Sequence, residues 1–120
     1  MEREPIGVIG AGYVGLVTAA GFAELGHEVW VRDIVPEKVE ALRGGEVPIH
    51  EPGLPELILK NSERLHFTIE MPDLLANAQL LFVCVDTPPT YSGDADLSRV
   101  EAVLAELAQH RFHAREIGVP

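Results

Sequence analysis

The chain has 120 residues, of which 47% are hydrophobic and 23% charged, and its formal net charge is -10. These values suit one globular domain and argue against a disordered or fibrous segment. The acidic excess argues against binding to nucleic acid or to a membrane surface, because both need clustered Lys and Arg side chains.

The first element is hidden in an uncharged stretch from Pro5 to Ala23. A membrane span needs about 20 apolar residues, so hydropathy alone would accept this stretch. A single helix would have to hold five glycines, each costing about 1 kcal/mol relative to Ala. The stretch is better interpreted as a strand over Pro5–Ile9, a tight turn, and a helix over Tyr13–Leu25.

Alternating strand and helix signals continue along the chain. The predicted elements are a strand over Glu28–Asp33, a helix over Pro36–Leu42 that ends at Gly44 and Gly45, an ordered loop over Pro48–Pro55, a short helix marked by Leu54, Leu57 and Ile58, and a strand over Leu65–Ile69. This alternation is typical of parallel sheets with helical crossovers.

The second half repeats the pattern with a helix over Pro72–Ala78 and an apolar run over Leu80–Val85. A run without polar breaks predicts a central strand buried on both faces. After a loop over Asp86–Ala95, Asp96 or Ser98 is expected to cap a helix. Its apolar stripe would be Leu97, Val100, Val103, Leu104 and Leu107. No strand is expected in the tail before Ile117.

These elements predict an α/β fold of the Rossmann type. It would be a doubly wound parallel sheet of about four strands in the order 3-2-1-4, joined by right-handed crossovers. Residues 1–120 would form a single, incomplete domain of this kind. The open edge beside the fourth strand favours association with another copy, hence a possible homo-oligomer.

The sequence holds one cysteine, Cys84, so one chain cannot form a disulfide framework. We therefore expect a reducing, cytoplasmic setting, and the first residues, Met1–Pro5, lack a signal peptide's features. The histidines lack metal-ligand spacing, and no metal site or catalytic constellation is predicted.

The turn after the first strand carries the main chemical signal. Its sequence fits the dinucleotide fingerprint G-x-G-x-x-G, in the residues Gly10, Ala11, Gly12, Tyr13, Val14 and Gly15. Gly10 would allow the tight turn, Gly12 would let the backbone approach a pyrophosphate, and Gly15 would let the helix lie close to the sheet. Free N–H groups at the start of the helix would face the phosphates.

Asp33 ends the second predicted strand, where an acidic residue can accept hydrogen bonds from ribose hydroxyls. This position favours NAD over NADP, because the carboxylate repels a 2′-phosphate. Arg32 should point to the other face of the strand. Lys38 could approach the adenosine side of the cofactor, or it could be a solvated helix charge.

A further segment of the candidate site follows the fourth predicted strand. It comprises Val85, Asp86, Thr87, Pro88 and Pro89. Ligands of open α/β sheets bind at the carboxyl ends of the strands, where Thr87 could offer a hydroxyl to a ribose or phosphate. The alternative is a rigid loop with no ligand role.

The chain resembles the amino-terminal domain of the UDP-glucose 6-dehydrogenase family, which includes GDP-mannose dehydrogenases. The resemblance is carried by "VIGAGYVGLVTAAGFAELGHEV", "RD", "PIHEPGLPELI" and "FVCVDTPPTYSGDADLS". It implies NAD bound by Gly10–Gly15, Asp33, Lys38 and Val85–Pro89. It also implies two successive NAD-dependent oxidations of a nucleotide sugar through a thiolate.

In that family the catalytic residues lie in later domains, which this sequence does not match. The resemblance therefore implies a NAD-binding portion that lacks the substrate domain and is inactive alone on UDP-glucose. A nucleotide sugar would be a partner only if that domain were supplied. The alternative is a non-catalytic dinucleotide-binding or interaction module. A dehydrogenase of the 3-hydroxyacid type is disfavoured by "IHEPGL" and "VDTPPT".

Overall fold

The computed structural model describes residues 3–110 and shows strands alternating with helices. In chain order the elements are β1 (Ile6–Ile9), α1 (Tyr13–Glu24), β2 (Val29–Arg32), α2 (Pro36–Arg43), α3 (Leu54–Lys60), β3 (Leu65–Thr68), α4 (Met71–Asn77), β4 (Leu80–Val83) and α5 (Ser98–Gln109). Each predicted strand and helix is present, with bounds that differ by a few residues. The expectation for the tail before Ile117 falls outside the described residues.

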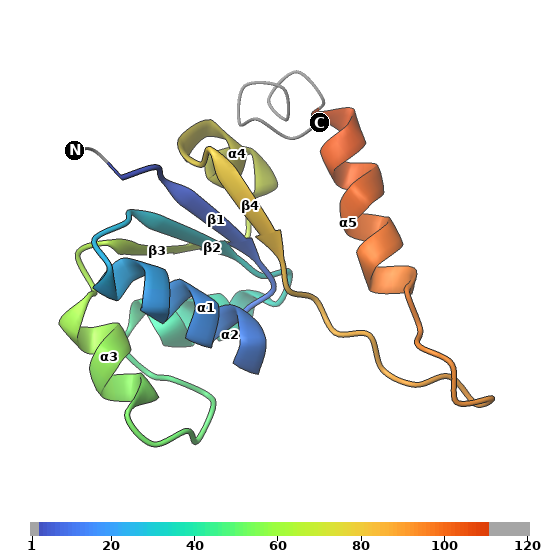
Figure 1. Cartoon of the computed structure of the whole chain (residues 1–120), viewed down its shortest axis with the longest axis horizontal. Coiled ribbons are helices and arrows are strands. Elements are labelled where there is room, and N and C mark those ends of the chain that lie inside the picture. The colour runs from blue at the N-terminus through green and yellow to red at the C-terminus, as the bar shows by residue number, and fades with distance from the viewer. Residues whose placement is uncertain (1–2, 111–120) are drawn as a thin grey trace.

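The four strands form one parallel sheet in the order β3-β2-β1-β4, which confirms the predicted α/β fold (Figure 1). Val8, at the centre, lies between Val31 of β2 and Phe82 of β4. Side chains of a strand alternate between the two faces of a sheet. Ile6 and Val8 accordingly pack in one buried cluster with α1 and α3, and Ile9 packs in a second with α4.

Helix α1 can lie close to the sheet because most of its buried residues are small. The buried positions are Gly15, Leu16, Ala19, Ala20 and Ala23. The uncharged opening stretch is thus divided between β1, a turn and α1. Among residues 3–110, no helix combines the length and apolar character that a bilayer crossing requires.

The prediction that the fourth strand is central and buried on both faces is wrong for the described structure. β4 lies at the edge of the sheet, and its ends, Leu80 and Val83, are 43% and 39% exposed. The physical reason is that β1 covers one edge of β4, while no strand within residues 3–110 pairs with the other edge. The apolar side chains of β4 are therefore left partly exposed by the described residues.

Beyond β4 the chain extends away from the sheet as an arm and returns through α5 (Figure 1). The arm closes on itself through an antiparallel bridge between Pro89 and Ala95. The Asp96 amide donates a 2.7 Å hydrogen bond to the Pro88 carbonyl oxygen. The turn at the tip leaves Tyr91 fully exposed.

The start and the apolar stripe of α5 differ in part from the prediction. Leu97 is the N-cap and the cap has no side-chain hydrogen bond, although the Ser98 amide donates to Asp96 Oδ1 at 2.9 Å. That bond lowers the pKa of Asp96. Val103 is buried against the sheet, whereas Leu97 and Leu104 stay about half exposed. Val103 and the partly buried Leu107 are the residues through which α5 joins the apolar cluster on this face of the sheet, so few apolar contacts hold the helix.

Candidate dinucleotide-binding site

Two glycines of the fingerprint are required by the fold itself: Gly10, in the turn after β1, and Gly15, in the first turn of α1. Gly10 has a φ of +107°, and a Cβ there would lie 2.7 Å from the Cys84 carbonyl oxygen at the end of β4. A Cβ on Gly15 would overlap the Gly10 carbonyl oxygen. The missing side chains let β1, β4 and α1 meet at one point, as predicted for the tight turn and the close helix.

Gly12 differs from these two, because the fold does not need a glycine there. Its φ of -83° and ψ of -164° are extended values that any residue adopts. A Cβ at Gly12 would meet one neighbouring atom within 4 Å, Asp86 Oδ1 at 3.7 Å. The backbone of Gly12 is therefore approachable from outside the protein, and its missing side chain leaves room for a ligand.

The first turn of α1 presents backbone N–H groups beside that open space. The first four N–H groups of a helix have no partner within it, and they form the positive end of its dipole. The first turn of α1 holds no acidic residue. Tyr13 and Val14 are 51% and 61% exposed, on the surface rather than in the core. The arrangement suits an anionic group such as a phosphate.

Asp33 joins three segments around this turn. Its side chain is nearly buried, with Oδ2 accepting a 2.8 Å hydrogen bond from the Ala11 amide and Oδ1 a 3.0 Å bond from the Val35 amide. Lys38 Nζ lies 3.6 Å from Oδ2. The bond to Ala11 was not foreseen in the sequence, since it links residues far apart in the chain. It fixes the carboxylate at the mouth of the site.

Arg32 takes no part in this arrangement. Its guanidinium donates to both carboxylate oxygens of Glu106 on α5, at 3.1 and 3.3 Å, and its Nε donates to the Ile69 carbonyl oxygen at 3.2 Å. Asp33, by contrast, bonds to the glycine turn. Arg32, the last residue of β2, thus contacts α5, and Asp33, the next residue, contacts the turn after β1.

Two clefts open at the carboxyl ends of the strands. The first, of about 280 Å³, lies beside Gly12 and is lined by Gly10, Gly12, Asp33, Ile34, Val35, Lys38, Cys84, Val85, Asp86 and Arg99. The second, of about 260 Å³, continues toward α5, and both are lined by Gly10, Asp33, Ile34, Val85 and Arg99. Their shared lining makes one continuous depression at the switch point of the sheet.

The predicted segment after β4, Val85–Pro89, lies only partly at this depression. Val85 and Asp86 line it, whereas Thr87, Pro88 and Pro89 are exposed on the arm and line neither cleft. The arm carries these three residues away from the sheet (Figure 1). The sequence reasoning also missed Arg99, which reaches the clefts from α5, because its spacing from the glycine turn carries no recognisable motif.

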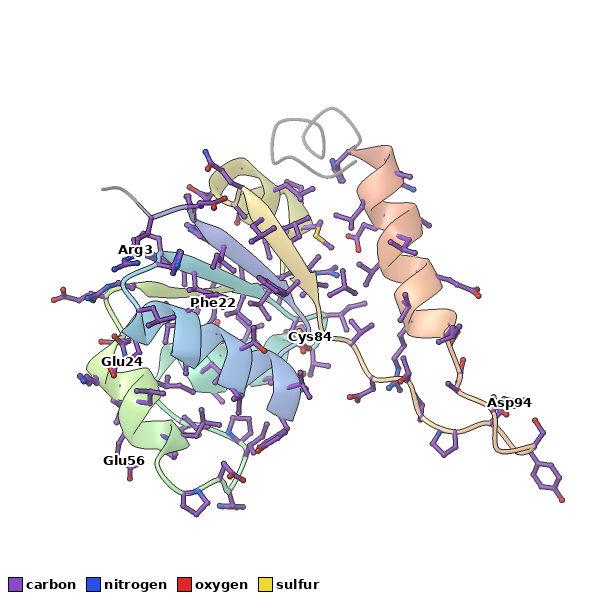
Figure 2. All side chains as sticks on the ribbon, in the orientation of Figure 1. Arg3, Phe22, Glu24, Glu56, Cys84 and Asp94 are labelled. Carbon is purple, nitrogen blue, oxygen red and sulfur yellow. The ribbon has the colours of Figure 1, made fainter. Side chains whose placement is uncertain are left out.

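Cys84 lies where the chain leaves β4, at the wall of the first cleft (Figure 2). Burial raises the pKa of its thiol, while a hydrogen bond with Thr18 acts in the opposite direction. A raised pKa disfavours the thiolate that nucleophilic chemistry needs. The part of the chain that the structure describes contains no group of three or more His, Cys, Asp or Glu residues that could hold a metal ion.

A larger hollow, of about 670 Å³, lies elsewhere on the molecule. It lies along the outer edge of β3, where its lining includes Trp30, Phe67 and Arg43. It shares no lining residue with the clefts beside the glycine turn. Although this hollow is larger, the fingerprint glycines Gly10 and Gly12 line the 280 Å³ cleft instead. The cleft is therefore the candidate ligand site.

Comparison with protein families gives one match over nearly the whole chain. The model described as "UDP-glucose/GDP-mannose dehydrogenase family, NAD binding domain" matches residues 4–117. The UDP-glucose 6-dehydrogenase of Pseudomonas aeruginosa is 52% identical over 103 residues, which are 83% of this chain and 22% of that protein. The UDP-glucose 6-dehydrogenase TuaD of Bacillus subtilis is 41% identical over 107 residues, which are 88% of this chain and 23% of that protein.

Solved structures agree with the sequence matches. A UDP-glucose dehydrogenase from Pyrobaculum islandicum has a TM-score of 0.80 and 40% identity, covering 98% of this chain and 25% of its own. A GDP-mannose dehydrogenase from Pseudomonas aeruginosa, solved as a ternary complex, has a TM-score of 0.84 and 35% identity, covering 92% of this chain and 25% of its own. The chain therefore spans about a quarter of the length of the relatives it matches.

Proposed function

Because the chain belongs to the UDP-glucose/GDP-mannose dehydrogenase family, in which it matches the NAD-binding domain, we propose that its glycine turn and the adjoining clefts bind NAD. The observation that carries this proposal is the open face of Gly12, which the fold itself leaves free. NAD supplies the hydride acceptor of these dehydrogenases. The chain's own residues bind and orient it.

The proposed roles follow the geometry of the site. The backbone from Gly10 through Ala11, Gly12, Tyr13 and Val14 to Gly15 would hold the pyrophosphate. Asp33 would accept hydrogen bonds from the adenosine ribose, since a carboxylate with two bonds from backbone amides still has free lone pairs. Its negative charge would disfavour the 2′-phosphate of NADP.

The remaining predicted residues take different places in this proposal. Lys38, at 3.6 Å from Asp33, would keep that carboxylate oriented at the ribose. Val85 and Asp86 would form the wall opposite the turn. Thr87, Pro88 and Pro89 would reach the cofactor only if the arm lay closer to the sheet.

We propose UDP-glucose as the nucleotide sugar of the whole protein. Support comes from sequence similarity: the identity to the UDP-glucose 6-dehydrogenase of Pseudomonas aeruginosa is 52%, against 36% to the GDP-mannose 6-dehydrogenase of Pseudomonas syringae. The oxidation of UDP-glucose to UDP-glucuronate would then need residues outside the matched quarter. Within the chain itself, Cys84 is the one cysteine, and its raised pKa opposes a thiolate.

Calorimetric titration of the 120-residue chain with NAD and with NADP, followed by an assay with UDP-glucose, tests these proposals. We expect NAD to bind more tightly than NADP, because Asp33 faces the ribose, and we expect no reduction of NAD by UDP-glucose. Reduction of NAD would contradict the proposed inactivity of the isolated chain. Equal affinity for the two cofactors would contradict the proposed role of Asp33.

The second candidate function is a non-catalytic module that senses NAD or pairs with another chain. The exposed outer edge of β4 supports it, because unpaired strand edges associate. Binding of NAD without turnover agrees with both candidates, and association of the chain with another copy would favour this one.

The same edge leads us to propose that the isolated chain self-associates. We expect sedimentation velocity to show a dimer or larger species that grows with concentration. The reason is that no strand within residues 3–110 pairs with the outer edge of β4, where Leu80 and Val83 are partly exposed. Replacing Val83 with Lys should shift the population toward monomer, since a charge on an edge strand opposes pairing. A parent chain that stays monomeric as its concentration rises would contradict the proposal.

A further inference from the structure

Arg99 lies where the two clefts of the candidate site meet. It belongs to the first turn of α5 and lines both the 280 Å³ cleft beside Gly12 and the 260 Å³ cleft beside α5. The arm between β4 and α5 leads away from the sheet before the chain returns through α5 (Figures 1 and 2). No family motif in the sequence singled it out.

The other two cations that line these clefts are already held by carboxylates. Arg32 makes a two-pronged ion pair with Glu106, and its side chain is 11% exposed. Lys38 lies beside the nearly buried Asp33. The Arg32–Glu106 pair joins β2 to α5, and Lys38 of α2 lies beside Asp33, the residue that directly follows β2.

Arg99 forms the most solvent-exposed of the three ion pairs. Its Nη1 lies 3.4 Å from Asp86 Oδ2, and the two side chains are 59% and 77% exposed. Ion pairs between exposed side chains contribute little to stability, because water and salt screen them. The guanidinium of Arg99 can therefore change partners at small cost.

Asp86 places this ion pair at the open face of Gly12. Its Oδ1 is the atom that lies 3.7 Å from the position of a Cβ on that glycine. A carboxylate at this place opposes a phosphate by like-charge repulsion. A neighbouring guanidinium would attract one, and it binds phosphate oxygens through two parallel N–H donors.

We propose that Arg99 is a pyrophosphate-binding residue, whose guanidinium exchanges the Asp86 carboxylate for a phosphate when NAD enters. The inference rests on the proposed function, since the phosphate it invokes is that of NAD. In this proposal the backbone N–H groups at the start of α1 bind the pyrophosphate from one side of the cleft, and the Arg99 side chain binds it from the other. α5, which few apolar contacts hold, thereby becomes part of the binding site.

The test is a titration of the 120-residue chain and its variants with NAD and with adenosine, followed by amide chemical shifts in NMR spectra. Arg99→Gln should raise the dissociation constant for NAD about tenfold, the loss expected for a hydrogen bond to a charged group. Adenosine, which has no phosphate, should bind the variant as it binds the parent. Arg99→Lys should recover part of the affinity, because it keeps the charge without the two-pronged geometry.

The control is Arg43→Gln, which removes the same charge from another exposed ion pair, with Glu40 on α2, and also removes a hydrogen bond from Arg43 Nε to the Phe67 carbonyl oxygen. Its affinity for NAD should equal that of the parent. If Arg99→Gln and Arg43→Gln weaken NAD equally, the effect is one of net charge and the inference is wrong. If Arg99→Gln weakens adenosine as much as NAD, the residue shapes the cleft rather than binding phosphate.

The Asp86→Asn variant shows whether Arg99 binds the phosphate itself or only neutralises the negative charge of Asp86. We expect this variant to bind NAD more tightly than the parent, because a repelling charge is gone and Arg99 is released. Adding Arg99→Gln to it should still weaken NAD about tenfold. A negligible effect in that background would mean that Arg99 only neutralises Asp86, which contradicts the inference while leaving the proposed function intact. Failure of the parent to bind NAD would contradict both.

Discussion

Replacing Gly15 with Ala should lower the free energy of unfolding by about 3 kcal/mol, at the upper end of the cost of overpacking. The new Cβ would overlap the Gly10 carbonyl oxygen, a backbone atom that cannot rotate away. Relief requires α1 to move off the sheet, which would loosen the contacts that bury Leu16 and Ala19. Urea unfolding followed by circular dichroism measures the change.

Gly21→Ala is the matched control, since it makes the same substitution in the same helix. A Cβ at Gly21 meets nothing within 4 Å. Ala is a better helix former than Gly, so we expect a gain of about 0.5 to 1 kcal/mol. A stability of Gly15→Ala equal to that of Gly21→Ala would show that α1 does not lie as close to the turn as described.

Gly12→Ala should leave the fold nearly intact and weaken NAD at least about tenfold, equal to about 1.4 kcal/mol of binding free energy. The backbone at Gly12 has ordinary dihedral angles and its Cβ position is open, so little strain arises. Ala is a poorer N-cap than Gly, which costs less than about 1 kcal/mol of stability. Under the proposed function, the methyl group would occupy the space through which the pyrophosphate meets the backbone.

Calorimetry with NAD measures this change, and the unfolding curve of the same variant shows whether the fold survives. Gly21→Ala is again the control, because it lies away from the turn on α1 and should bind NAD like the parent. A well-folded Gly12→Ala protein with unchanged affinity would exclude the open face of Gly12 as the phosphate site.

The strand order could be predicted because the relevant physics is local. Apolar runs that alternate with amphipathic helices imply parallel strands. Gly10 and Gly15 indicate where the chain passes from the first strand into the first helix, because a side chain at either position would clash with nearby backbone. Asp33 could be placed at the mouth of the site because it directly follows β2. The order 3-2-1-4 also needs the glycine fingerprint, because periodicity and right-handed crossovers allow other doubly wound orders.

Other features depend on contacts that a single sequence does not reveal. The apolar run of β4 predicts burial on both faces, but burial also needs a neighbouring strand, which residues 3–110 do not provide. The bond from the Ala11 amide to Asp33 and the approach of Arg99 to Asp86 join distant segments. Thr87 follows the predicted strand closely, yet the arm turns it away from both clefts.

The central claim, that NAD binds at the glycine turn, is tested most directly by mapping amide chemical shifts of the 120-residue chain during a titration with NAD. The account predicts saturable shifts at Gly12 and its neighbours in the turn, at Asp33, and at Val85 and Asp86 across the cleft. Shifts confined to the larger hollow at the edge of β3, around Trp30 and Phe67, or the absence of any saturable shift, would contradict it.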